Sequence, residues 1–136
     1  MKLLSLVLLA VLGFGLWVRL APSDPVRWHV SVGDAGNRDF AGAVIRTVPA
    51  QPGDMARLDR IIRDTPRTVV LAGAPEEGMV TYVTRSRLWG FPDYTTLEAR
   101  PGVIVIHGRL RFGSSDLGVN RARVEGWLTT LAAGRT

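Results

Sequence analysis

The sequence predicts an α+β domain, in which an antiparallel sheet of about four to five strands packs against one helix that precedes it and one C-terminal helix. Three observations support this fold class. Four strand-like runs follow one another with short turns between them, and two segments with helical periodicity lie on either side of these runs. An uncharged apolar stretch opens the chain as a separate hydrophobic anchor helix.

This opening stretch has the composition of a targeting segment. No charge occurs from Leu3 to Val18, and a helix of that length covers about 24 Å, which suits either a signal peptide or a short anchor. Cleavage after Ala21 is disfavoured because Arg19 occupies the third position before the cut and a proline follows it. Residues 1–21 are therefore predicted to stay in the lipid bilayer as a signal-anchor.

Charges near the anchor predict its orientation. Lys2 and the free amino terminus favour a cytoplasmic N-terminus, although Arg19 and Arg27 on the other side oppose it. We therefore expect a single-pass protein of the bacterial inner membrane, with its globular domain in the periplasm.

The next segment, residues 22–53, is rich in Pro, Gly and Asp and is predicted to be an extended lead-in with one edge strand. A helix is predicted over residues 54–64, with Asp54 as its N-cap and Pro66 preventing its continuation. The globular α+β domain is predicted to span residues 54–134. The apolar positions at helical spacing are Met55, Leu58, Ile61 and Ile62.

Four strand-like runs follow this helix: TVVLAG, GMVTYVTRSRL, DYTTLEA and GVIVIHGRLRF. The connections between them are short, which suits an antiparallel meander. In the last run, Ile104 and Ile106 fall on one face of the strand. His107, Arg109 and Arg111 fall on the opposite face.

The chain closes with a predicted helix. Val124, Trp127, Leu128 and Leu131 form an apolar stripe that can cover one face of the sheet, and Gly134 can end the helix.

The composition excludes several function classes. Cysteine is absent, which rules out disulfides, thiolate metal sites and a cysteine nucleophile. His29 and His107 stand in no metal-ligand spacing, and no glycine motif for phosphate or dinucleotide binding is present, so no metal and no cofactor are predicted. The net charge is +5, and eight arginines against four acids gather in residues 85–136. A nucleic-acid partner would need a stronger basic field, and none is predicted.

The segment SDLGVNRARV, residues 115–124, raises the question of a binding site. Two arginines lie in the first turn of the final helix, where the helix dipole is already positive. In one interpretation Asn120 caps the helix, Asp116 pairs with one of these arginines, and the loop is only a connector. In the other, the loop and arginines from two strands hold an anion such as a phosphate, a carboxylate or a lipid headgroup. The candidate ligand-binding residues are Arg85, Arg87, Arg109, Arg111, Asp116, Asn120, Arg121 and Arg123.

Two segments, YVTRSRLWGFPDY (82–94) and GRLRFGSSDLGVNRARVEGWL (108–128), resemble the bacterial and plastid family called domain of unknown function 1499. The hallmark of that family is an alternation of serine and arginine, then glycine, then Ser-Asp-Leu-Gly-Val-Asn. This sequence departs from it at Gly108 and Leu110, where the family often has serine. The resemblance covers most of residues 20–133. It implies a small domain, often membrane-attached or exported, and brings no established activity or catalytic residue.

The leading functional expectation is a membrane-anchored envelope domain that acts as a non-catalytic binding module. Its ligand is expected to be an anionic small molecule, a lipid headgroup or an envelope protein. Two alternatives stay open: a hydrolase that uses His107 with a nearby serine or aspartate, and a scaffold for envelope assembly. The apolar cluster LWGFPDY (88–94) is either a membrane-proximal or partner-binding edge or a core-filling hairpin.

Overall fold

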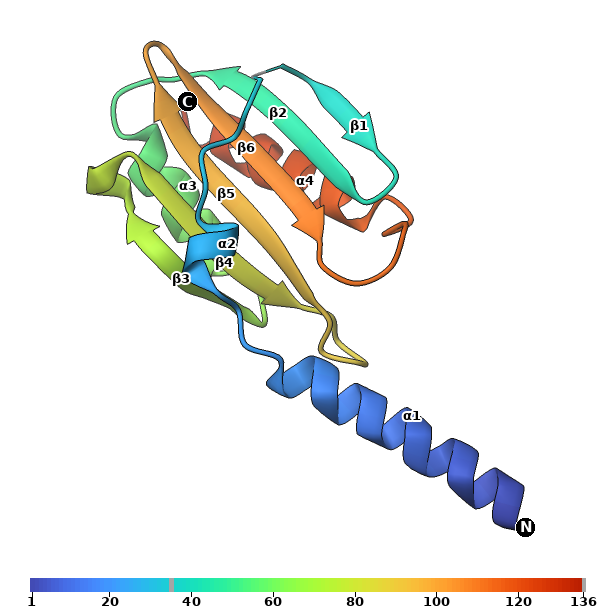
Figure 1. The fold of residues 1–136 in the computed structure, drawn as a ribbon. Helices are drawn as coiled ribbons and strands as arrows, with labels where there is room; N and C mark the ends of the chain where they lie inside the picture. The colour runs from blue at the N-terminus through green and yellow to red at the C-terminus, as the bar shows by residue number, and fades with distance from the viewer. Residues whose placement is uncertain (35, 136) are drawn as a thin grey trace.

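The computed structural model describes residues 1–34 and 36–135 and shows an α+β fold built on a six-stranded antiparallel sheet (Figure 1). The strands lie in the order β1-β2-β6-β5-β4-β3. The predicted fold class is confirmed, with a strand count slightly above four to five. The bounds are Arg38–Phe40 for β1, Ala43–Pro49 for β2, Thr68–Ala74 for β3, Met79–Arg85 for β4, Pro92–Arg100 for β5 and Val103–Leu110 for β6.

The strand count is higher because residues 38–49 form a hairpin, β1 and β2, where the sequence predicts a single edge strand. β2 is an inner strand that pairs with β1 on one side and with β6 on the other, from Ala43 opposite Arg109 to Pro49 opposite Val103. Its partner β6 lies far along the chain, so no local pattern marks β2 as internal. The sheet therefore includes strands on both sides of the predicted boundary at residue 53.

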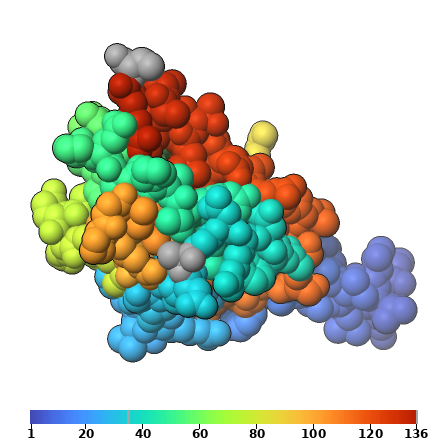
Figure 2. All heavy atoms as spheres, turned by 90° about the horizontal axis from the view of Figure 1, so that it is seen from above, coloured from blue at the N-terminus to red at the C-terminus, as the bar shows by residue number. Residues whose placement is uncertain are grey.

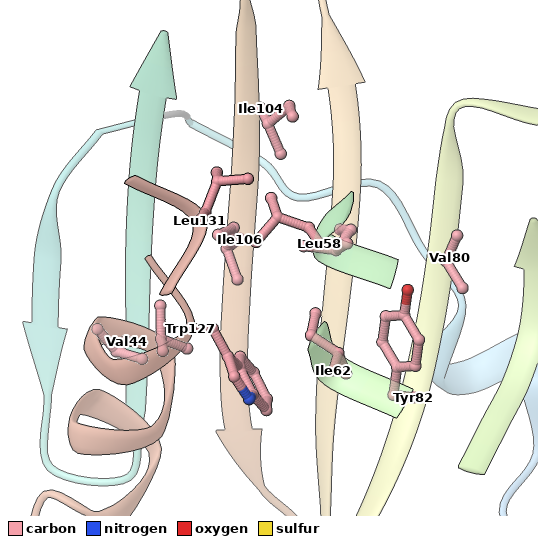
Figure 3. Packing of buried hydrophobic residues seen from close by; sticks show 11 residues of the cluster. Val44, Leu58, Ile62, Val80, Tyr82, Ile104, Ile106, Trp127 and Leu131 are labelled. Atoms are coloured by element: carbon pink, nitrogen blue, oxygen red, sulfur yellow. The ribbon is translucent and has the colours of Figure 1, made fainter. Parts of the chain in front are cut away.

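Two helices, α3 (Asp54–Arg63) and α4 (Val119–Ala133), cover one face of the sheet, and the main hydrophobic core lies between that face and the helices (Figure 3). The apolar stripes predicted for both helices contribute to this core. Burial of the apolar stripe of α4 holds this helix on the sheet, because an isolated helix of this length is only marginally stable in water. The core residues labelled in Figure 3 are Val44, Leu58, Ile62, Val80, Tyr82, Ile104, Ile106, Trp127 and Leu131.

The opposite face of the sheet is covered by residues 22–32, which we call the covering segment. It contains the short helix α2 (Pro25–Trp28) and lies on the side away from α3 and α4, as the light-blue spheres in Figure 2 show. The Trp28 ring stacks on the Tyr94 ring with 3.9 Å between centroids, and Val32 packs in a second apolar cluster. The molecule thus has three layers, with the sheet in the middle.

The first helix, α1 (Lys2–Leu20), projects away from the domain (Figure 1). It is long and apolar enough to cross a membrane, with a mean hydropathy of 2.3 over 18 residues. Membrane anchors and signal sequences share these properties. Its C-terminal part contacts the domain: Val18 is buried, and the Trp17 and Phe112 ring centroids are 5.5 Å apart.

The start of α3 differs slightly from the prediction, because Gly53 is its N-cap and Asp54 is its first residue. The Asp54 carboxylate is fully buried and accepts hydrogen bonds from the Gln51 N–H (2.8 Å) and from the guanidinium groups of Arg57 and Arg135. Burial alone would raise the pKa of Asp54, but these hydrogen bonds hold it below its usual value. Asp54 therefore ties the start of α3 to the end of the chain.

Candidate functional site

The eight candidate residues do not surround one cavity. The Cβ position of Gly108 faces Asn120 and Val124 of α4, so the neighbouring Arg109 projects from the other face of β6. The arginines of α4 and of β6 are therefore separated by the sheet. The candidates form three groups: Arg109 with Arg111; Asp116, Asn120, Arg121 with Arg123; and Arg85 with Arg87.

The first group holds the covering segment on the sheet. Arg109 donates to the Trp28 carbonyl oxygen (2.5 Å) and to Thr96 Oγ1 (3.1 Å), and its Cζ lies 5.5 Å from the centre of the Trp28 ring. Arg111 donates to the Pro22 carbonyl oxygen (2.8 Å) and to Tyr94 Oη (3.1 Å). Burial lowers the pKa of Arg109 to about 10. These contacts assign both arginines to the fold.

His107 lies on the same face of β6 as Arg109. Burial and the nearby charge of Arg109 lower the pKa of His107 to about 4. In the part of the chain that the structure describes, its ring forms no hydrogen bond with a serine or a carboxylate. Nor do three His, Asp or Glu side chains within residues 1–34 and 36–135 lie close enough to hold a metal ion. The hydrolase alternative gains no support from this geometry.

Acidification is expected to destabilise the protein partly through His107. Because the folded-state pKa of about 4 lies below the ordinary value of 6.5, the folded state binds the proton more weakly than the unfolded state does. Stability is lost as the pH falls below 6.5, and the full loss of roughly 1–3 kcal/mol is reached below pH 4. Urea unfolding of the wild type and of His107→Gln at several pH values measures this. Parallel pH profiles for the two proteins would contradict the prediction.

The second group forms the start of α4, where Gly118 is the N-cap and the Asp116 carboxylate accepts N–H groups of the cap and the first turn. Its Oδ1 accepts the Gly118 N–H and its Oδ2 accepts the Asn120 N–H, both at 2.9 Å. The helix begins at Val119, so the predicted N-cap at Asn120 is wrong. Asn120 already lies in the first turn, and its own N–H is one of the groups that need a partner.

Arg121 in this turn and Arg123 in the next turn pair with acids other than Asp116. Arg123 lies 3.2 Å from the Asp93 carboxylate, and Arg121 lies 3.8 Å from the Asp39 carboxylate. These acids offset the unfavourable helix dipole, the role that the connector interpretation gave to Asp116. Burial raises the pKa of Asp93, and Arg123 opposes this rise. The adjoining pocket of about 240 Å³ is lined by Asp39 and Asp116 beside Arg121, which disfavours an anion there.

The third group belongs to a pocket of about 410 Å³ that contains four arginines, which we call the basal arginine pocket. The predicted Arg85 and Arg87 are joined there by Arg19, at the end of α1, and by Arg67, before β3. No acidic residue lines the pocket, and among the described residues none of the four arginines forms an ion pair. The remaining lining residues are Val69, Val83, Ser86 and Gly90.

Main-chain carbonyl groups position three of the four guanidinium groups. Arg19 donates to two carbonyl oxygens of the loop between β4 and β5, at 3.1 and 3.3 Å. Arg67 donates to the Arg85 carbonyl oxygen (3.0 Å), and Arg85 donates to the Gly90 carbonyl oxygen (2.9 Å). Gly90 has φ of +71°, and a Cβ there would lie 2.9 Å from the Arg19 side chain. Glycine thus permits the close approach of Arg19.

The sequence reasoning missed Arg19 and Arg67. Arg67 precedes β3 and Arg85 ends β4, and Thr68 pairs with Thr84 in this hairpin. A register shift between Val70 and Ala72 brings the two arginines side by side, and no sequence pattern marks that shift. The position of Arg19 depends on how α1 meets the domain, which no sequence pattern encodes.

Comparison with known proteins identifies a family. The family model described as "Protein of unknown function (DUF1499)" matches residues 19–131, a range that includes all four arginines of the pocket. No curated protein matches the chain. A solved structure that it resembles is a DUF4468 family protein from Bacteroides ovatus, with 14% identity and a TM-score of 0.30. The match covers 65% of this chain and 63% of that one, less than two thirds of its length, and carries no argument.

Proposed function

We propose that this chain, which belongs to the DUF1499 family of proteins of unknown function, is a membrane-anchored module that binds a phosphate-class anion without turning it over. The observation that carries the proposal is the basal arginine pocket: four arginine residues line a volume of about 410 Å³, with no acidic residue in the lining. The other candidate arginines contact carbonyl groups, hydroxyl groups or acids of the fold, as described above.

The charge balance of the pocket favours an anion. The positive charges of four arginines that line one pocket repel one another, and a phosphate group would relieve this repulsion while accepting charge-assisted hydrogen bonds. Each guanidinium carries five N–H donors. The contacts to carbonyl oxygens use two donors of Arg19 and one each of Arg67 and Arg85, so donors remain for a ligand. The planar guanidinium group of arginine can also donate to two oxygens of one phosphate at the same time.

The membrane anchor in this proposal is α1. Its apolar surface is exposed over most of the helix, since only 6% of an 18-residue apolar stretch is buried. Arg19 lies at the end of α1 and contacts the β4–β5 loop, so the end of the helix is part of the folded domain. We further propose that the domain lies on the periplasmic side of the bacterial inner membrane. Alkaline phosphatase fused after Thr136 would then be active, and an inactive but stable fusion would overturn this orientation.

Neutralising two pocket arginines is expected to abolish most anion binding. Full-length protein in maltoside micelles, which contain no phosphate, is titrated with inorganic phosphate while arginine Nε–Hε resonances are followed by NMR. Arg85→Gln/Arg87→Gln should weaken binding by about tenfold or more, because each lost charge-assisted hydrogen bond contributes about 1–2 kcal/mol.

The matched control is Arg38→Gln/Arg60→Gln. It removes the same charge from two exposed arginines outside the pocket and should leave phosphate affinity within about twofold. Equal weakening in both double variants would show that net charge alone attracts phosphate. That result, or a wild type that binds no phosphate, would contradict the proposed function.

A further inference from the structure

We infer that the anion in the basal arginine pocket is the phosphate of a membrane phospholipid, with one acyl chain in an apolar groove between α1 and the β4–β5 loop. This inference rests on the proposed function and specifies its ligand class. The groove has a volume of about 290 Å³. Its lining residues are Val11, Leu12, Gly15, Leu16, Arg19, Leu88 and Trp89.

The groove and the arginine pocket adjoin one another. Arg19 lines both, and the loop residues Leu88 and Trp89 in the groove directly precede Gly90 in the pocket. The Arg19 guanidinium donates to the carbonyl oxygens of these same two loop residues. A molecule with a charged head and an apolar tail therefore fits the two sites together, whereas a free phosphate would occupy the first alone.

The direction of the groove matches the direction of a lipid in a bilayer. Val11 lies eight residues before Arg19, about 12 Å along the axis of α1. With Arg19 at the level of the headgroups, the groove extends toward the hydrocarbon interior along the anchor. At Gly15 an added Cβ would lie at an ordinary contact distance of 3.6 Å from the Trp89 ring, so the loop lies against the helix at this turn.

The β4–β5 loop exposes apolar side chains where a lipid would cover them. Leu88 is 75% exposed and Trp89 is 42% exposed, although both stand beside the anchor. A second hollow, of about 470 Å³, also borders Trp89 and is lined by apolar residues of α1 and by Phe91. Tryptophan and leucine beside arginine at the end of a membrane helix suit the boundary between headgroups and acyl chains. A groove in this position would lie within the bilayer, so lipid is the ligand that we expect to fill it.

The test compares two probes that share a phosphate. Full-length protein in maltoside micelles is titrated with dihexanoyl phosphatidylglycerol and with glycerol 3-phosphate, and bound lipid is counted by native mass spectrometry. We expect the lipid to bind at least about tenfold more tightly than glycerol 3-phosphate, because even a short acyl chain buries apolar surface in the groove.

Two double variants distinguish binding of the lipid headgroup from binding of its acyl chain. Leu88→Ser/Trp89→Ser should remove the preference for lipid and leave inorganic phosphate affinity within about twofold, whereas Arg85→Gln/Arg87→Gln should weaken both probes. Leu117→Ser, an exposed leucine outside the groove, is the matched control and should change neither.

Each failure has a distinct meaning. If lipid and glycerol 3-phosphate bind equally, and the loop variant has no effect, the ligand is a soluble anion; the lipid inference is overturned and the proposed function survives. If neither probe binds the wild type, both fail. Lipid binding that persists in Arg85→Gln/Arg87→Gln would overturn the assigned headgroup position. A photo-crosslinker at residue 88 that captures a protein in cells, with no lipid adduct, would also overturn the inference.

Discussion

Replacement of Gly73 by alanine is expected to lower the free energy of unfolding by about 2–5 kcal/mol, with two separate causes. Gly73 has φ of +80°, a backbone conformation that strains any residue with a Cβ. The added Cβ would also lie 2.1 Å from the Met79 carbonyl oxygen and 2.7 Å from the His29 ring. The carbonyl is held by the β3–β4 pairing, so it cannot move aside cheaply.

Gly78 provides a matched control for this substitution. Its φ of +78° is nearly the same, but a Cβ there would meet no atom within 4 Å. Gly78→Ala should therefore cost only the conformational part, about 1–2 kcal/mol. Urea unfolding of the full chain in micelles, followed by near-ultraviolet circular dichroism, compares the two variants. Equal destabilisation would mean that the contact with β4 contributes nothing.

The second large effect is expected at Trp127, whose truncation to alanine should cost about 3–5 kcal/mol. The side chain is 5% exposed and fills the core between α4 and the sheet (Figure 3). Its indole N–H also donates to Thr65 Oγ1 (2.8 Å), just beyond the end of α3. Alanine would leave a cavity and remove the bond that links the two helical segments.

Trp127→Phe divides this effect into its parts. Phenylalanine keeps most of the apolar volume but cannot donate to Thr65, so a smaller loss of about 1–2 kcal/mol is expected from the missing hydrogen bond and the residual space. The same unfolding measurement applies. A phenylalanine variant as unstable as the alanine variant would show that the hydrogen bond, and not core volume, dominates at this position.

The elements with a strong local pattern were predictable from the sequence. The stripes on α3 and α4 and the four runs that became β3 to β6 follow from apolar periodicity, because each buries one face against the core. β2 was underestimated for the opposite reason. It is defined by pairing with β6, and proline and glycine in its neighbourhood look like loop when read locally.

The candidate site was predictable only in part. The sequence indicates which arginines lie on the same face of a strand. Whether the arginines of α4 lie near those of β6 depends on the side of the sheet on which α4 packs. Arg121 and Arg123 lie on the side of the sheet opposite to Arg109 and pair with acidic residues of β1 and β5. The basal arginine pocket depends on a hairpin register and on the docking of α1, and these are tertiary facts.

The joint between α1 and the sheet has a mechanical consequence. Val18 is buried and the helix ends at Leu20. Only two residues after that end, the carbonyl oxygen of Pro22 accepts a hydrogen bond from Arg111. A long flexible tether would let a domain swing and search the space above a bilayer. This domain has no such slack, so in the proposed anchored state it would tilt with its helix and work in the layer next to the membrane.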